Sequence, residues 1–391
     1  MKYNVIIFLV FNTLSFIALG QPKVDEHKCK EAKEDIANYQ FAQALKGLLS
    51  CEHDSLEHIK DIALCYYKIG QFVQAESYYK KALSQAKEDI TAINQLANIY
   101  AKKTDYQQCV LQYEKLIAID SNNGYYHKQL AIYAKRGNKL GLAFKHLGIA
   151  YHLNPSDLSV IHMLTIFYIG LDEFDMAKEY LKKGLTLDST HIQLLLVKAK
   201  LAYAQKDYAA IVHAITKCLP YQNDTSAYQL KLLGIAYFHL DDHVRSIECL
   251  TKAIDLQETE VIHYYLGLNF KATGLLDEST FHFEKAINIG ITDHIATYYS
   301  ALATVLEENE DYQASIKAYQ AAYNYSQNKV ILFHLARNYD TYYADKEPAL
   351  AYYKMYLSHN DTGNKELMNY SQYRVSEIRE LLHFGMDSTR L

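Results

Sequence analysis

The sequence is poor in the residues that build turns. Its 391 residues include only 4 Pro and 15 Gly, and Trp is absent. A sheet protein of this length would need many more turn residues, whereas the abundant Ala, Leu, Lys, Glu and Gln favour helices. The formal net charge of −5 is small for this length. The chain therefore lacks the strong field of a nucleic-acid-binding protein, and no nucleic-acid partner is expected.

Long apolar runs are also absent, except at the N-terminus. There Lys2 precedes the mostly apolar stretch 5–19, and Ala18 and Gly20 place small residues before Gln21. This pattern predicts a signal peptide over residues 1–20, cleaved after Gly20, and an exported protein in the periplasm or outside the cell. The alternative is a retained membrane anchor, but about fifteen apolar residues fall short of the ~20 that span a bilayer. No membrane insertion of the mature chain is expected.

A repeat with a period near 34 residues follows a linker over residues 21–27. In each copy a small or medium residue stands three positions after a bulky one and four positions before another bulky one. Successive copies of this residue are 31 to 36 positions apart: Ala44, Ala75, Cys109, Ala143, Ala177, Ile211, Ser246, Ser279, Ser315 and Ala349. Spacings of three, four and seven belong to one face of an α-helix. We therefore expect the second helix of each repeat here.

A second motif precedes the first in each copy by about twelve residues. It pairs a small residue with an aromatic or large one three positions later, as in Ala97 with Tyr100 and Gly267 with Phe270. Two copies depart from it, because Ala134 and Ala202 stand where an aromatic residue is usual. These departures indicate local repacking and not a different fold. Each repeat is thus two helices joined by a short polar turn.

These motifs resemble the tetratricopeptide repeat family. The resemblance covers residues 28–358 as about ten repeats and implies an all-α fold, a right-handed superhelical α-solenoid of antiparallel helix pairs. Terminal repeats of such arrays need a polar cap. Residues 359–391 are expected to supply a capping helix and a tail, with the stripe Leu367, Tyr370, Arg374, Ile378 and Leu381 facing the last repeat.

The resemblance also implies a concave groove lined by the first helix of each repeat. Transferred position by position, the groove is basic, bears asparagines and is rich in tyrosine, which suits an acidic segment of a protein or peptide partner. It turns acidic near Glu307, Glu308 and Asp340. The alternative is that these residues are ordinary solvated helix faces. The implied partner-binding residues are Lys60, Tyr67, Lys68, Asn94, Asn98, Lys102, Tyr125, Lys128, Lys135, Arg136, Lys200, Tyr203, Tyr228, Lys231 and Tyr264.

Cysteine and histidine are the residue types in this sequence that could form disulfides or bind metals. Cys29 and Cys51 stand at the start of the first helix and the end of the second helix of repeat one, so they form a possible disulfide. Closing this loop of about 22 residues would stabilise the terminal repeat by roughly 3 kcal/mol. The densest group of metal-ligand residue types is His239, Asp241, Asp242 and His243. We interpret it as a capped turn, and predict no metal site and no cofactor.

No nucleophile motif, metalloprotease motif or phosphate-binding loop occurs. We therefore assign no catalytic residue and predict no enzyme activity. The leading hypothesis is an exported interaction scaffold or adaptor that binds a peptide or partner protein in its groove. A carbohydrate-binding or cell-wall-binding protein that uses its tyrosines is one alternative. A metal-dependent enzyme on a helical-repeat frame is the other.

Overall fold

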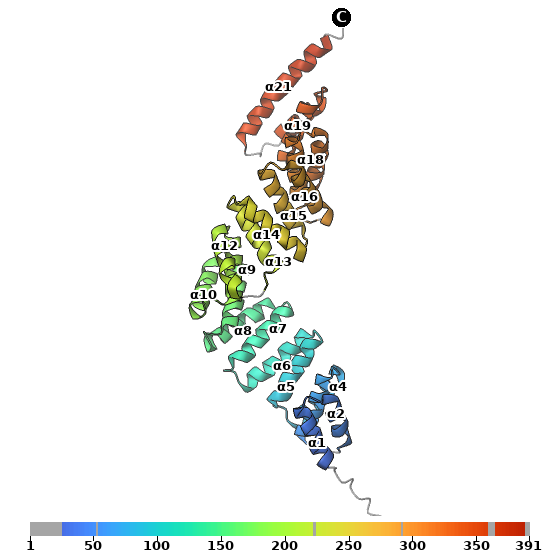
Figure 1. Ribbon diagram of the computed structural model, residues 1–391, viewed down its shortest axis with the longest axis vertical. Coiled ribbons are helices and arrows are strands. Elements are labelled where there is room, and N and C mark those ends of the chain that lie inside the picture. Colours follow the sequence, from blue (N-terminus) through green and yellow to red (C-terminus); the bar gives the residue numbers. More distant parts are fainter. Residues whose placement is uncertain (1–25, 52–53, 222–223, 291, 359–363, 388–391) are drawn as a thin grey trace, which may run out of the picture. The chain divides into compact units, whose positions relative to one another are not determined.

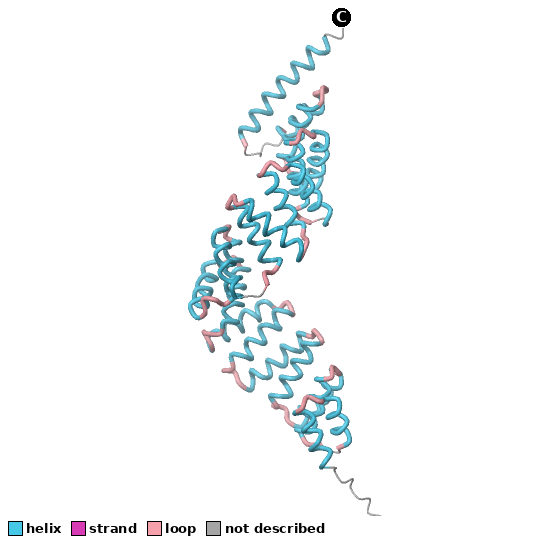
Figure 2. The backbone as a smooth tube through the Cα atoms, in the orientation of Figure 1, coloured by secondary structure: helices cyan, strands magenta, loops and turns pink. Residues whose placement is uncertain are grey.

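A computed structural model describes residues 26–51, 54–221, 224–290, 292–358 and 364–387, and in these residues it contains helices and no strands (Figures 1 and 2). The predicted all-α repeat fold is confirmed. The predicted signal peptide lies outside the described residues. The helices are α1 (Glu26–Ala37), α2 (Phe41–Ser50), α3 (Leu56–Lys68), α4 (Phe72–Gln85), α5 (Ile90–Lys102), α6 (Tyr106–Ile119), α7 (Gly124–Arg136), α8 (Leu140–Leu153), α9 (Leu158–Gly170), α10 (Phe174–Leu187), α11 (Ile192–Ala204), α12 (Tyr208–Cys218), η1 (Leu219–Tyr221), α13 (Ala227–His239), α14 (His243–Leu256), α15 (Glu260–Ala272), α16 (Leu276–Ile289), α17 (Ile295–Glu308), α18 (Tyr312–Ser326), α19 (Val330–Tyr342), α20 (Glu347–Leu357) and α21 (Lys365–Asp387).

The even-numbered helices begin where the repeat motif begins. The bulky residue that opens the motif is the first residue of α2, α4, α6, α8, α10, α12, α14, α16 and α18, and α20 begins one residue after it. At the N-terminal end, α1 starts at Glu26, two residues before the predicted start of the array. The local spacing of bulky and small residues therefore positions these helices along the chain.

The turns within the hairpins share one backbone conformation. A residue with positive φ stands two positions before each even-numbered helix from α2 to α18, for example Gly70 (82°), Thr104 (57°) and Asp241 (58°). Next to Thr104, the N–H of Asp105 donates to the carbonyl of Tyr100 over 2.9 Å. This i to i−5 bond is the Schellman arrangement that satisfies the end of a helix. Several turns then cap the following helix with an aspartate, as Asp105 does for α6.

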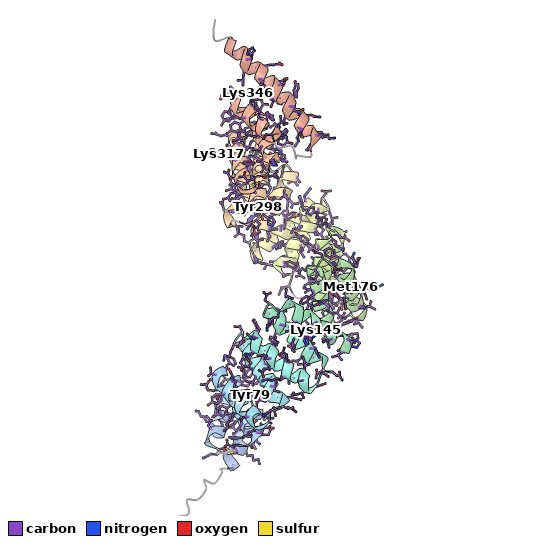
Figure 3. The ribbon with its side chains drawn as sticks, turned by 180° about the vertical axis from the view of Figure 1, so that it is seen from behind. Tyr79, Lys145, Met176, Tyr298, Lys317 and Lys346 are labelled. Carbon is purple, nitrogen blue, oxygen red and sulfur yellow. A yellow bond between two sulfur atoms is a disulfide. The ribbon has the colours of Figure 1, made fainter. Side chains whose placement is uncertain are left out.

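The core is built from small residues that let helices approach and aromatic residues that fill the space between them. Ala75 and Ala82 of α4 are fully buried, and Tyr79, which lies between them on the same face, is only 1% exposed (Figure 3). Tyr113, Tyr319 and Tyr353 occupy the equivalent position of other repeats and are also buried. Burial of such large rings is a main favourable contribution to the stability of each hairpin.

The helices form two compact units, residues 1–167 and 168–391, with the boundary inside α9. Within each unit consecutive hairpins lie side by side in chain order (Figure 1). No helix in the described part of the chain is long and apolar enough to cross a membrane.

Helix α21 caps the last hairpin of the second unit, but its buried face differs from the predicted stripe. Ser371, Val375 and Ile378 are the buried residues. The expectation for Leu381 was wrong, because its side chain is 58% exposed and Leu382 packs inward instead. The predicted stripe placed the C-terminal contact one residue too early. Arg374 anchors the helix: its guanidinium donates to both carboxylate oxygens of Asp340 over 2.8 and 2.9 Å.

Helix α1 at the other end is joined to α2 by a covalent bond. The structure records a disulfide between Cys29 and Cys51, whose Cα atoms are 6.0 Å apart, a separation usual for such bonds. The charged helix α1 buries Ala32 against α2. A cross-link that closes a loop of this length adds about 3 kcal/mol to stability in the chain-entropy description.

Candidate functional site

All predicted partner-binding residues lie on odd-numbered helices. In the first unit they belong to α3, α5 and α7, and in the second unit to α11, α13 and α15. Because the two units are separate compact bodies, each surface is considered by itself.

Two of the predicted lysines link neighbouring repeats. Lys60 of α3 lies 3.0 Å from Asp89, the residue that caps α5, and Lys128 of α7 lies 2.7 Å from Asp157, which caps α9. All four side chains are at most one-fifth exposed. The ammonium groups are therefore neutralised by carboxylates of the next repeat. These lysines stabilise the stack, a role that the sequence analysis did not foresee.

The two asparagines also make internal contacts. The side chain of Asn94 accepts a 3.4 Å hydrogen bond from the Tyr113 hydroxyl, and the amide of Asn98 donates to Gln95 over 3.3 Å. Both are half-buried. Their remaining polar atoms still reach solvent, so a partner would meet the amides as secondary contacts.

Of the predicted basic residues in the first unit, four are exposed: Lys68, Lys102, Lys135 and Arg136, called here the basic row. They lie in the last turns of α3, α5 and α7. Positive charge near a helix C-terminus interacts favourably with the helix dipole, so these four residues also stabilise their own helices. Lys68 lies over the ring of Phe41, Lys135 over Phe167 and Arg136 over Tyr133, each within 6 Å of the ring centroid. Three of the four charges in the row therefore lie over aromatic rings.

Aromatic side chains gather on successive odd helices of the second unit. We define the tyrosine cluster as Tyr203 of α11, Tyr228 of α13, and Tyr264 and Tyr265 of α15. Tyr203 and Tyr228 are 44% and 45% exposed, and the Lys231 ammonium lies 5.8 Å from the Tyr228 ring centroid. Burial, and then the nearby Tyr203 hydroxyl, raise the pKa of Tyr228. The same two causes, in that order, raise the pKa of Tyr265.

The inner part of the cluster joins the core. The Tyr264 ring lies 5.5 Å from the ring of Tyr265 and 5.2 Å from that of Tyr298 on α17, and Phe238 of α13 lies 5.5 Å from Tyr265. Tyr264 and Tyr265 are therefore held by ring contacts with neighbouring helices. Tyr264 is among the predicted partner-binding residues and Tyr265 is not, although the two tyrosines are adjacent in the sequence.

The acidic residues expected near the C-terminal repeats make internal ion pairs. Glu307 binds Arg337 and accepts a hydrogen bond from Asn338, and Glu308 lies 3.0 Å from Lys271. Asp340 holds Arg374 of the capping helix as described above. The expectation of an acidic groove end was therefore wrong, since these carboxylates are neutralised within the fold.

His239, Asp241, Asp242 and His243 each have a structural role. The His239 ring stacks on Tyr208 with centroids 4.0 Å apart, Asp241 takes the positive-φ turn position, and Asp242 caps α14. His243 contacts the side chain of Asn269 over 3.0 Å. Among the described residues, no group of three or more His, Cys, Asp or Glu is arranged to hold a metal ion.

Two histidine pairs, which the sequence analysis did not single out, occupy equivalent hairpins in the two units. Nδ1 of His127 lies 2.8 Å from Nδ1 of His146, and the same distance separates His263 from His282. Such a bond needs one donor and one acceptor, so at least one ring of each pair is neutral. Burial, followed by the partner ring, lowers the pKa of His146 and of His282 to about 4.

Models of the tetratricopeptide repeat match residues 60–91, 90–123 and 161–191. These segments fall on the helix pairs α3 to α6 and on the pair α9 and α10. The chain is a tetratricopeptide repeat (TPR) protein.

Curated relatives of this TPR protein are distant. The BBSome complex member BBS4 of Bos taurus is 23% identical over 68% of this chain and 51% of its own length. The anaphase-promoting complex subunit CDC16 of Saccharomyces cerevisiae is 22% identical over 63% of this chain and 26% of its own. For lipopolysaccharide assembly protein B of Escherichia coli the values are 21%, 50% and 43%. The chain spans about half or less of the length of these relatives.

Solved structures with a similar fold include a tetratricopeptide repeat protein from Parabacteroides merdae, at 16% identity and a TM-score of 0.48 over 65% of this chain and all of that one. The hetero-tetramer Cut9–Hcn1 of the anaphase-promoting complex matches at 14% identity and a TM-score of 0.49, over 89% of this chain and 83% of that one.

Proposed function

We propose that this TPR protein is an exported interaction scaffold that binds a segment of a partner protein on its odd-numbered helices. The observation that carries the proposal is the tyrosine cluster. Tyr203 and Tyr228 expose nearly half of their surface, and, in addition to burial, Tyr203 is close enough to Tyr228 and Tyr265 to raise the pKa of both hydroxyls. Preorganised aromatic side chains of this kind are typical binding hot spots, because little conformational entropy is lost on contact.

The basic row supports the same proposal in the first unit. Lys68, Lys102, Lys135 and Arg136 have exposed charges, while Lys60 and Lys128 are engaged within the fold. We therefore assign the attraction of acidic partner segments to the row, and not to the whole predicted set. Charges of this type mainly raise the association rate, and their effect weakens with salt.

The proposal includes export, which rests on the N-terminal pattern from Lys2 to Gly20. The disulfide between Cys29 and Cys51 supports it, because stable disulfides belong to oxidising compartments. Sequencing the N-terminus of the protein from its host tests this part, and we expect the mature chain to begin at Gln21.

Crosslinking in the host, with a photoreactive residue in place of Lys102 or Tyr203, identifies the partner, and titration then measures its affinity. We expect Tyr203→Ala with Tyr228→Ala to raise the Kd about 10- to 100-fold, as loss of two hot-spot rings implies. The control is Tyr221→Ala with Tyr325→Ala, which removes two similarly exposed rings on η1 and α18, outside the odd-numbered helices. Equal weakening by the two double variants would contradict the placement. Binding to purified cell-wall polysaccharide without any crosslinked protein would contradict the proposal as a whole.

A further inference from the structure

At some junctions between repeats the aromatic residue that fills the space is missing. Tyr100 of α5 and Tyr237 of α13 stand three residues after the small residue of their helix and are only 6% and 9% exposed. Tyr100 packs with Ala75 and Tyr79 of the preceding α4, and its hydroxyl donates to Glu76 over 3.1 Å. The ring thus occupies the space between an odd helix and the even helix before it. In α11 this place is held by Ala202.

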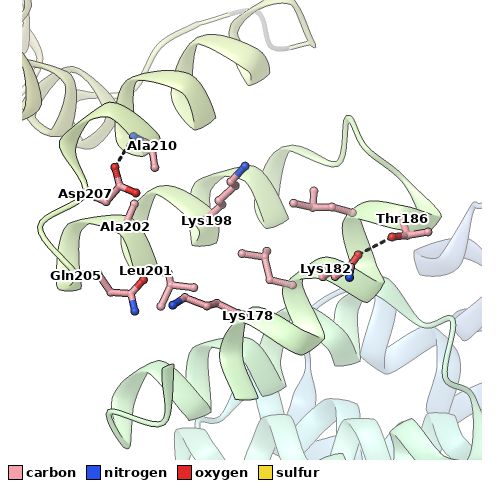
Figure 4. A pocket seen from close by; sticks show the side chains of 11 residues that line it. Lys178, Lys182, Thr186, Lys198, Leu201, Ala202, Gln205, Asp207 and Ala210 are labelled. Carbon is pink, nitrogen blue, oxygen red and sulfur yellow. Dashed lines mark hydrogen bonds between the residues drawn. The ribbon is translucent and has the colours of Figure 1, made fainter. Parts of the chain in front are cut away.

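A cavity of about 440 Å³ is present at this junction, between α10 and α11 (Figure 4). Leu181 and Leu185 of α10 and Leu201 and Ala202 of α11 line its apolar part. The volume is in the range of sites that take small ligands or side chains, ~300–1,000 Å³. All of the lining residues belong to the second unit.

The second departure from the motif confirms why the cavity exists. Ala134 of α7 also replaces the aromatic residue, and a cavity of about 300 Å³ lies beside it, lined by Tyr106, Val110 and Tyr133. Two alanines at the same repeat position therefore each leave a space next to the preceding even helix. The Ala134 cavity has a single lysine, Lys139, in its lining.

The Ala202 cavity differs in its charge. Lys178 and Lys182, one turn apart on α10, and Lys198 of α11 all line it (Figure 4). In the described part of the chain no carboxylate lies within 4.0 Å of the Lys182 or Lys198 ammonium, and Lys178 only reaches Asp175 at 4.0 Å. The one carboxylate in the lining, Asp207, is engaged as the cap of α12 and accepts from the Ala210 N–H over 3.0 Å. Apolar walls and uncompensated positive charge thus coincide here.

We propose that the Ala202 cavity binds an aromatic side chain of a partner segment with acidic residues on either side of it. The ring would provide the packing that a tyrosine provides at the other junctions, and the flanking carboxylates would pair with Lys178, Lys182 and Lys198. This inference rests on the proposed function, since it names the chemistry of a partner segment. It uses a different surface from the tyrosine cluster.

The probe is an acetylated and amidated pentapeptide with a central tryptophan and two glutamates on each side. The protein contains no Trp, so tryptophan fluorescence reports the peptide alone. We expect a blue shift of the emission on binding, because the indole moves from water into apolar surroundings. The same peptide with lysines in place of the glutamates should not bind.

Ala202→Tyr tests the site, because it restores the residue type of the other repeats and fills the cavity. We expect it to weaken peptide binding at least about tenfold, while the matched control Ala134→Tyr leaves the affinity unchanged. Lys182→Glu with Lys198→Glu changes only surface charges, and should weaken binding by a similar factor without altering the circular dichroism spectrum. This second variant keeps the test decisive if Ala202→Tyr fails to fold.

Unchanged affinity in Ala202→Tyr or in the lysine double variant would overturn the proposal, as would equal binding of the lysine peptide. Binding of decanoate without binding of the glutamate peptide would also overturn it, and would assign the cavity to an alkyl anion. The two proposals fail separately. Loss of native-partner capture in the Tyr203 and Tyr228 double variant reports on the tyrosine cluster, whereas the pentapeptide reports on the cavity.

Discussion

Gly267 of α15 offers a quantitative test of the close packing between paired helices. A Cβ atom added at this glycine would lie 2.7, 2.8 and 2.9 Å from three ring atoms of Phe283, which is fully buried in α16. Overpacking of this kind costs about 1–3 kcal/mol, because the ring and the backbone must move apart. Alanine regains about 0.5–1 kcal/mol through its higher helix propensity. For Gly267→Ala we therefore expect a net loss of up to about 2.5 kcal/mol.

Gly148 of α8 provides the matched control, because it also lies inside a helix but a Cβ atom there would meet nothing within 4 Å. Gly148→Ala should stabilise its hairpin by about 0.5–1 kcal/mol. Repeat arrays do not always unfold in one step, so hydrogen exchange of α15, α16 and α8 measures each local effect. Equal stabilisation by Gly267→Ala and Gly148→Ala would refute the close packing of Gly267 against Phe283. Phe283→Leu in the Gly267→Ala background should recover part of the loss, as a double-mutant cycle would show.

Two further predictions concern the capping helix and the histidine pairs. Arg374→Leu leaves the Asp340 carboxylate, which is only 7% exposed, with Lys346 at 3.7 Å as its remaining ion pair. The change should therefore destabilise the docking of α21 by about 3 kcal/mol. Limited proteolysis should then cleave α21, whereas α21 of the control variant Arg379→Leu, which changes an exposed residue, should remain protected. His146 and His282 have lowered pKa values of about 4 in the folded chain, so the unfolded chain takes up protons first as the pH falls. The free energy of unfolding should be greatest above pH 6.5 and fall by about 1–2 kcal/mol per histidine pair between pH 6.5 and 4, after allowance for solvent screening. Denaturation midpoints measured across this pH range test the prediction. If the double variant His146→Phe with His282→Phe keeps the wild-type dependence on pH, other groups cause the loss of stability.

The repeat architecture could be predicted because its determinants are local. The residues from Phe72 to Ala82 place bulky and small side chains at spacings of three, four and three, and that spacing alone defines both a helix and its buried face. The polar turns could be predicted for the same reason, since Asp105 and Asp242 stand at capping positions before the apolar pattern resumes. The departures Ala134 and Ala202 were visible as missing aromatics, but the cavities beside them were not.

The tertiary structure decided which residues of the candidate sites are free to bind a partner. Lys60 and Lys128 have the same local pattern as exposed groove lysines, and only the stacking of repeats brings Asp89 and Asp157, each 29 residues away in sequence, against them. The pairing of Asp340 with Arg374, 34 residues later, likewise depends on where α21 docks.

By itself, the sequence determined the helical hairpins, their boundaries and their inward faces, because these follow from contacts between residues a few positions apart. Only the tertiary structure decided which charges stay free, which tyrosines stay exposed and where a junction stays empty. Electrostatic neutralisation and cavity formation depend on what the next repeat places opposite a side chain, and that neighbour is a full repeat away along the chain.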